Sequence, residues 1–141
     1  MKTCWQSLFL FLVGWVVLMG GTAGSAVWGA EEDATPKTRT FTGRWNNKKY
    51  GTSGPLKCVA TETAPGQWKA TFTGTFHNDP FTYEANFQSK TVRNQQTVGG
   101  TAKVRGHDYQ WTGTIKNGQL SANYKSSVGY FGQFVMKEVQ E

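Results

Sequence analysis

The sequence WKATFTGTFH, residues 68–77, alternates between two kinds of side chain. Every second residue is apolar or small, and every residue in between is polar; the first set is Trp68, Ala70, Phe72, Gly74 and Phe76. A strict period of two is the pattern of a β-strand with one face in an apolar interior and the other in water. The stretch therefore predicts a strand that covers one side of a core.

The same alternation recurs along the chain. The kernel aromatic-x-Gly-x-aromatic appears at 41–45, 72–76 and 130–134, with a variant at 111–115. Asn117-Gly118 lies between two alternating runs and is typical of a type I′ hairpin turn. No window shows a sustained helical period. The predicted strands are 39–46, 55–63, 68–77, 81–88, 97–105, 108–116, 119–125 and 130–137.

Eight short strands with short connections predict an all-β fold, a small antiparallel up-and-down barrel. Closure of the last strand on the first removes the two edges that an open sheet would expose. The outward positions carry mainly Thr and Lys, as at Thr71, Thr73 and Lys103. Lipid-facing residues of a membrane barrel are apolar, so this pattern predicts a barrel in water with its apolar face inside.

Residues 1–30 are predicted to be a signal peptide. Lys2 precedes the apolar run 8–19, and a stretch rich in small residues follows it. Cleavage after Ala26 or after Ala30 fits this pattern, and the apolar run is short for a membrane span. Residues 31–38 read as a flexible acidic spacer and residues 39–137 as the barrel domain. We expect an exported monomer, periplasmic or extracellular, with no membrane span in the mature chain.

The mature chain is basic and has one cysteine. Residues 31–141 keep 14 of the 15 Lys and Arg and all nine Asp and Glu, a net charge of +5. Such a charge favours an anionic surface or polymer as partner, or simply keeps the protein soluble. Cys58 alternates with Leu56 and Ala60, so we expect it to fill space inside the barrel.

The glycines in the middle of the inward faces leave two interpretations open. Either aromatic rings fill the space beside them and the core is solid, or a cavity remains that holds one small apolar or aromatic ligand. In the second case the predicted lining residues are Trp45, Trp68, Tyr83 and Trp111.

Alternate loops of an up-and-down barrel share one end, which gathers many polar residues. A basic rim for an anionic partner is predicted at Lys48, Lys49, Arg105 and Lys125. The same end offers a candidate site for a divalent metal, or for hydrolysis, at His77, Asp79, His107 and Asp108.

Catalytic signatures are missing from the sequence. It has no paired inward carboxylates, no Gly-x-Ser-x-Gly and no HExxH. The aromatic residues face inward and the chain carries an export signal, which argues against stacking on nucleic acid. We therefore expect a non-enzymatic binding or interaction module without a cofactor; the alternative is the metal-binding or hydrolytic protein described above.

Three resemblances accompany this interpretation. Gly54-Pro55-Leu56 and Pro80-Phe81-x-Tyr83, with the closing Gly132-x-Phe134, resemble landmarks of an uncharacterised group of small exported bacterial β-barrel proteins. The stretch FTGRWNN, residues 41–47, is similar to the opening strand of avidin-type barrels, and the whole pattern resembles a calycin- or lipocalin-like architecture. Small periplasmic barrels that inhibit metalloproteases are similar in architecture and imply protease inhibition as a further alternative.

Overall fold

The computed structural model describes residues 35–140, which form eight β-strands. The predicted signal peptide, residues 1–30, and the first four residues of the predicted spacer lie outside the described residues. The strands are β1 (Thr38–Asn47), β2 (Thr52–Ala64), β3 (Gln67–Phe76), β4 (Asp79–Val92), β5 (Gln95–Val104), β6 (His107–Lys116), β7 (Gln119–Ser126) and β8 (Phe131–Val139).

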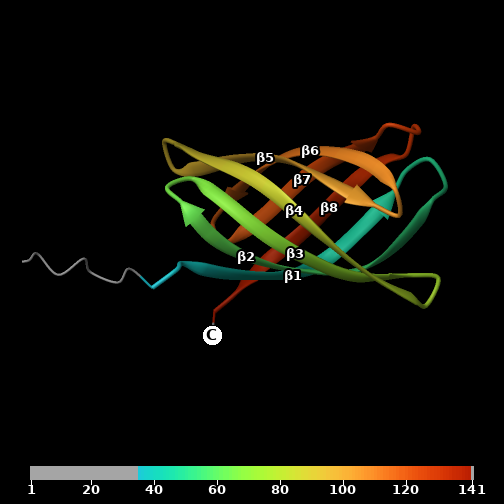
Figure 1. The fold of residues 1–141 in the computed structure, drawn as a ribbon, viewed down its shortest axis with the longest axis horizontal. Helices are drawn as coiled ribbons and strands as arrows, with labels where there is room; N and C mark the ends of the chain where they lie inside the picture. Colours follow the sequence, from blue (N-terminus) through green and yellow to red (C-terminus); the bar gives the residue numbers. More distant parts are fainter. Residues whose placement is uncertain (1–34, 141) are drawn as a thin grey trace, which may run out of the picture. The chain divides into compact units, whose positions relative to one another are not determined.

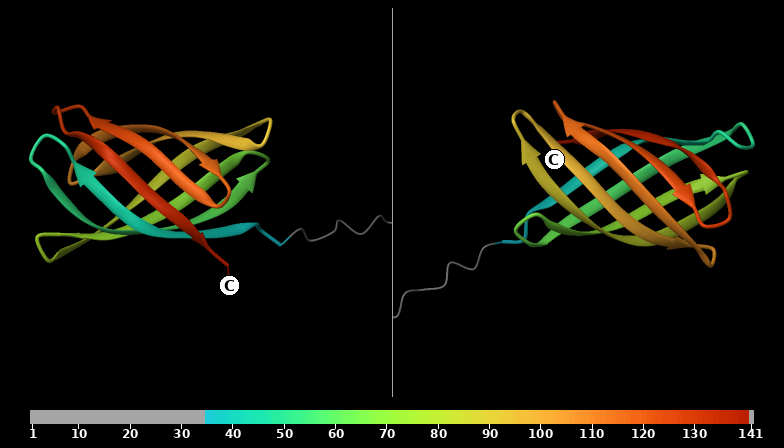
Figure 2. Two further views of the ribbon diagram at one scale, coloured as in Figure 1. Left: turned by 180° about the vertical axis from the view of Figure 1, so that it is seen from behind. Right: turned by 90° about the horizontal axis from the view of Figure 1, so that it is seen from above.

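The strands form a closed antiparallel barrel in the order of the chain, with β8 paired back to β1 (Figure 1). The eight-stranded up-and-down barrel predicted from the alternation is confirmed. Two further views show the strands running obliquely around the barrel (Figure 2). The loops after β1, β3, β5 and β7 gather at one end, which we call the mouth, and the remaining turns lie at the closed end (Figure 1).

The inward-facing residues predicted from the period of two are confirmed. In β8, Phe134 and Met136 are buried whereas Phe131 and Val135 are exposed. Most strands differ from the predicted ranges by one or two residues at an end, but two are clearly longer: β2 begins at Thr52, and β4 continues to Val92. Both extensions consist largely of polar residues whose backbone pairs with a neighbouring strand, and side-chain composition alone does not reveal such pairing.

The closed half of the barrel has a filled core. Phe72 lies at its centre, stacked on Tyr83 with ring centroids 5.0 Å apart and meeting Trp111 and Phe134 edge-on. Trp68 stacks on Phe87 nearer the closed end, at 5.9 Å. Offset and edge-on ring contacts of this kind add to the hydrophobic gain from burial. Cys58 is also buried here, as predicted.

The mid-strand glycines allow close approach between neighbouring strands. A Cβ on Gly74 would lie 2.6 Å from Cζ of Phe81 and 2.6 Å from the carbonyl oxygen of Pro55, so only glycine fits. None of the mid-strand glycines lines the cavity described below. They serve close packing, and the hollow part of the barrel has another origin.

An ion pair lies inside the closed end of the barrel. Arg39 donates hydrogen bonds from Nε and Nη2 to the two carboxylate oxygens of Glu138, at 2.6 and 2.8 Å, and from Nη1 to Gln96 at 2.7 Å. Its guanidinium lies 5.0 Å from the ring centroid of Phe41. The carboxylate of Glu138 therefore neutralises Arg39, and these contacts join β1 to β8 and to β5.

Over residues 35–140 the structure contains no helix of a length and apolarity that would let it cross a membrane.

Candidate functional site

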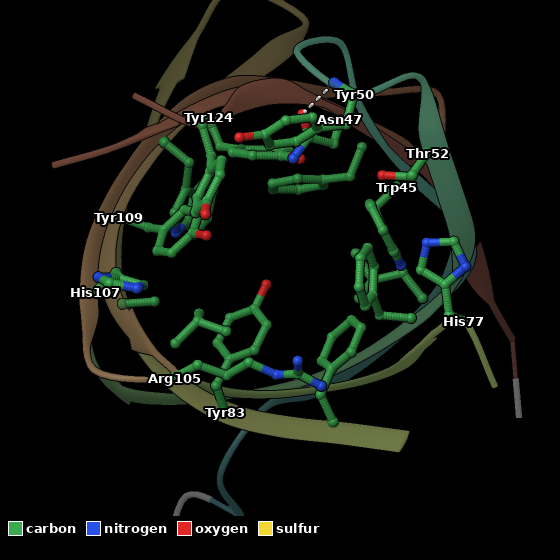
Figure 3. Close-up of a pocket in the computed structure, with 18 residues that line it drawn as sticks. Trp45, Asn47, Tyr50, Thr52, His77, Tyr83, Arg105, His107, Tyr109 and Tyr124 are labelled. Atoms are coloured by element: carbon green, nitrogen blue, oxygen red, sulfur yellow. Dashed lines mark hydrogen bonds between the residues drawn. The ribbon is translucent and has the colours of Figure 1, made fainter. Parts of the chain in front are cut away.

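The mouth half of the barrel contains a cavity of about 510 Å³ (Figure 3). Small-molecule sites in proteins commonly measure roughly 300–1,000 Å³. Most of the lining side chains are aromatic or aliphatic and come from strands all around the barrel. They are Trp45, Asn47, Tyr50, Thr52, Leu56, Phe76, His77, Phe81, Tyr83, Ala102, Val104, Arg105, His107, Tyr109, Trp111, Tyr124, Tyr130 and Phe134.

The deepest lining residues are buried and belong equally to the core. Leu56, Trp111 and Phe134 are each at most 5% exposed, and all three line the cavity. Phe72 supports Trp111 and Phe134 from the filled side. Since a close-packed core fixes the positions of these rings, the cavity has a rigid apolar floor.

The loop between β1 and β2 is fixed to the barrel by side-chain caps. The side-chain oxygen Oδ1 of Asn47 accepts hydrogen bonds from the backbone N–H groups of Lys49 and Tyr50, at 2.9 and 3.3 Å; Figure 3 shows the second. The backbone N–H of Lys48 donates to the carbonyl of Phe131 at 2.9 Å. These bonds set Tyr50 at one side of the mouth.

The loop between β7 and β8 forms the adjoining part of the rim. Ser126 accepts a hydrogen bond at Oγ from the backbone N–H of Tyr130, at 2.9 Å. The ring of Tyr130 lies 5.7 Å from that of Tyr50, and Nζ of Lys49 lies 5.3 and 5.4 Å from the two ring centroids. The two loops thus meet through an aromatic pair capped by a cation.

Three tyrosines bring hydroxyl groups into the cavity. Tyr83 extends its hydroxyl toward the centre, opposite Tyr109 and Tyr124 (Figure 3). Burial raises the pKa of Tyr83, of Tyr109, and of Tyr124, the last to about 12. All three are therefore neutral phenols near neutral pH. The hydroxyl of Tyr124 donates to the carbonyl of Asn46 at 2.7 Å.

Two lining residues carry polar atoms without a partner. Within residues 35–140, the buried side-chain nitrogen or oxygen atoms that lack a hydrogen bond are Oγ1 of Thr52 and Nε1 of Trp111. Buried polar groups in folded proteins are nearly always hydrogen-bonded. Both atoms belong to residues that line the cavity, although neither atom is itself exposed to it. The other indole at the mouth, Trp45, donates its N–H to the carbonyl of Thr75 at 3.2 Å.

Three of the four residues predicted to line a cavity do so: Trp45, Tyr83 and Trp111. Trp68 does not. It is 4% exposed, stacks on Phe87 and donates its indole N–H to Ser89 at 3.0 Å. It lies near the start of β3, and β3 runs from the closed end to the mouth. Its position along the barrel therefore excludes it, although it faces inward as predicted.

The four cations predicted to form a basic rim occupy different places. Arg105 lines the cavity, with its guanidinium carbon 5.7 Å from the ring centroid of Phe76. Lys49 caps the tyrosine pair of the adjoining loops. Lys48 and Lys125 are exposed and do not line the cavity. The structure thus places two of the four predicted rim residues at the opening.

The residues of the predicted metal or hydrolytic site are not brought together. His77 and His107 line opposite sides of the mouth (Figure 3). Asp79 is exposed, and Asp108 points to the outer face, where its carboxylate lies 3.7 Å from Lys103. In the described part of the chain, no three His, Cys, Asp or Glu side chains cluster so that they could hold a metal ion.

Sequence reasoning missed most of the lining residues, although some were within its reach. Phe81, Tyr109 and Tyr124 face inward by the period of two and lie near the mouth ends of their strands. Tyr130 begins the alternating kernel 130–134 and was within reach in the same way, whereas Tyr50 lies in a loop, where alternation gives no signal.

A scan of the chain against protein-family models finds no match, and no curated protein is found to resemble it.

Proposed function

We propose that the protein is an exported, non-enzymatic binding module that holds one small apolar ligand in the mouth of the barrel. The observation that carries this proposal is the cavity of about 510 Å³. Its floor is the rigid face of the core, and its aromatic walls offer large apolar contact at low cost in side-chain entropy. The apolar run in residues 1–30 supports export.

The polar residues among the lining support the same proposal. Asn47, Arg105 and the hydroxyl of Tyr83 lie among walls that are mostly aromatic and aliphatic. A few polar groups among many apolar ones are typical of sites that orient a ligand as well as bury it.

The experiment is a titration of the purified protein with the uncharged dye N-phenyl-1-naphthylamine. Trp45 and Trp111 line the cavity, so a bound dye will quench tryptophan emission and its own emission will rise. We expect saturable binding of one dye per chain. The absence of saturable binding would refute the proposal.

A pair of variants locates the bound dye. Ala102→Phe places a ring in the cavity and should weaken binding at least about tenfold, a loss of roughly 1.4 kcal/mol. Thr101→Phe adds the same ring at the neighbouring residue, which is exposed on the outer face, and should leave binding unchanged. Equal weakening by both would place the dye outside the barrel.

A further inference from the structure

The mouth of the cavity carries positive charge without a counter-charge. None of the residues that line the cavity is an Asp or Glu, whereas Arg105 lines it and Lys49 lies over the tyrosine pair at its edge. Across residues 35–140, neither cation takes part in a salt bridge. An anion at the opening would therefore meet two free cations and no repelling carboxylate in the lining.

The closed end of the same barrel shows the opposite arrangement. There the inward cation, Arg39, is fully engaged by Glu138 and Gln96. Arg39 is largely buried and needs these partners, because leaving a buried charge unpaired is costly. Arg105 is exposed at the rim, so it stays unpaired at little cost and its guanidinium is available to a ligand.

The backbone at Arg105 suits asparagine. Arg105 has φ +49° and precedes Gly106 at φ +81°, the geometry of a type I′ turn between β5 and β6. Asn is strongly preferred over Arg at the first of these two positions, and the chain itself places Asn117 before Gly118 in the equivalent turn at the closed end. Arg93 also has a positive φ, at +57° in a turn of the closed end, so this conformation does not by itself single out Arg105.

A neutral hydroxyl donor lies between the charged opening and the apolar floor. The hydroxyl of Tyr83 extends toward the centre of the cavity (Figure 3), whereas that of Tyr124 already donates to the carbonyl of Asn46. A phenol can donate a hydrogen bond to an oxygen of an anionic group. From the floor to the opening, the cavity therefore changes from apolar walls, through the hydroxyl of Tyr83, to cations.

We propose that the ligand is a free amphipathic anion whose apolar body lies among the aromatic walls and whose single anionic head lies between Arg105 and Lys49. This inference rests on the proposed function, because it assigns a ligand class to the same cavity. One molecule then occupies both the cavity and the basic rim, which the sequence predicted as two separate candidate sites.

The test compares two dyes that share one aromatic body. N-Phenyl-1-naphthylamine is uncharged, and 1-anilinonaphthalene-8-sulfonate adds a sulfonate to it. We expect the sulfonate to bind about tenfold more tightly at low salt, and the difference to shrink at about 0.5 M NaCl because of screening. If neither dye binds, the proposed function fails. If the uncharged dye binds equally well or better, the binding function stands and the anionic ligand class is refuted.

Matched variants test whether the tighter binding of the sulfonate depends on the cations at the mouth. Arg105→Asn should remove most of the advantage of the sulfonate, leave binding of the uncharged dye within about twofold, and keep or raise the melting temperature, since Asn suits the turn. Lys49→Gln should reduce the advantage by a smaller factor. Arg93→Asn removes an arginine at φ +57° from the turn at the closed end and should leave the advantage intact. An undiminished preference in Arg105→Asn would overturn the proposal.

Displacement of the bound sulfonate dye distinguishes a free anionic ligand from a membrane lipid. Dodecanoate and phosphatidylglycerol vesicles are added separately to the complex. We expect displacement by dodecanoate at concentrations where vesicles of equal anionic charge have no effect. Displacement by vesicles alone would assign the site to a membrane lipid and overturn the proposal of a free ligand.

Discussion

Replacing Ala102 by leucine should have the opposite effect on stability from the same change at Ala70. The two alanines lie in one row of inward positions, because Ala70 pairs with Ala85 and Ala85 pairs with Ala102 across neighbouring strands. Ala102 lines the cavity, whereas Ala70 is 1% exposed and does not line it. The pair therefore compares the hollow half of the barrel with the filled half at nearly constant backbone geometry.

The magnitudes follow from the three carbon atoms that leucine adds. At Ala102 they become buried against the cavity wall, which contributes up to about 2.4 kcal/mol at roughly 0.8 kcal/mol per carbon. Loss of rotamer freedom offsets about 0.5–1 kcal/mol of this gain, so Ala102→Leu should stabilise the fold by up to about 1.9 kcal/mol. At Ala70 the added carbons overpack a dense core, which costs about 1–3 kcal/mol.

Thermal unfolding followed by circular dichroism measures both effects. In a domain of roughly 100 residues, 1 kcal/mol shifts the melting temperature by about 4 °C or more. Ala102→Leu should therefore melt as high as the unmodified protein or a few degrees above it, and Ala70→Leu should melt several degrees below. Similar losses in both variants would show that the mouth half is as filled as the closed half, and the reasoning would be refuted.

Three further predictions concern titratable groups. Hydrogen bonds from Arg39 lower the pKa of Glu138, so the pair stabilises the fold above the unfolded pKa and loses this effect as the pH falls. In urea denaturation, Glu138→Gln should cost about 1–2 kcal/mol near pH 7 and much less near pH 3, whereas Glu84→Gln, which breaks an exposed pair, should cost less than about 1 kcal/mol. Burial raises the pKa of Tyr124 to about 12, so stability should fall between about pH 10 and 12, and this fall should be smaller in Tyr124→Phe. Burial likewise raises the pKa of Cys58 to about 12, so Ellman's reagent should react with its thiol only on unfolding; rapid reaction in the folded protein would contradict the structure.

The barrel could be predicted because its signal is local. A period of two is visible within any strand, and the residues 68–77 already assign each side chain to a face. The ends of the strands were harder to predict. Thr52 and Ser53 look like loop residues, yet they pair with Asn47 and Asn46 and belong to β2. Pairing partners from another segment decide such cases, and they are not visible in a single stretch of sequence.

Predicting the position of the cavity also required the height of each inward residue along the barrel, which alternation does not give. Trp45 and Trp68 face inward equally, but one lies at the mouth end of its strand and the other at the closed end. Counting residues from the turns would have separated them. The ion pair of Arg39 and Glu138 was not predicted, because the two residues are 99 positions apart and meet only in the register that β8 takes against β1, which the sequence pattern does not give.

A crystal structure of the protein with 1-anilinonaphthalene-8-sulfonate would test the central claim most directly. We expect the naphthalene ring within contact distance of Trp45 and Tyr83, and the sulfonate within hydrogen-bond distance of Arg105. A barrel whose mouth has closed inward around its own aromatic rings, with the dye on the outer surface or absent, would contradict it.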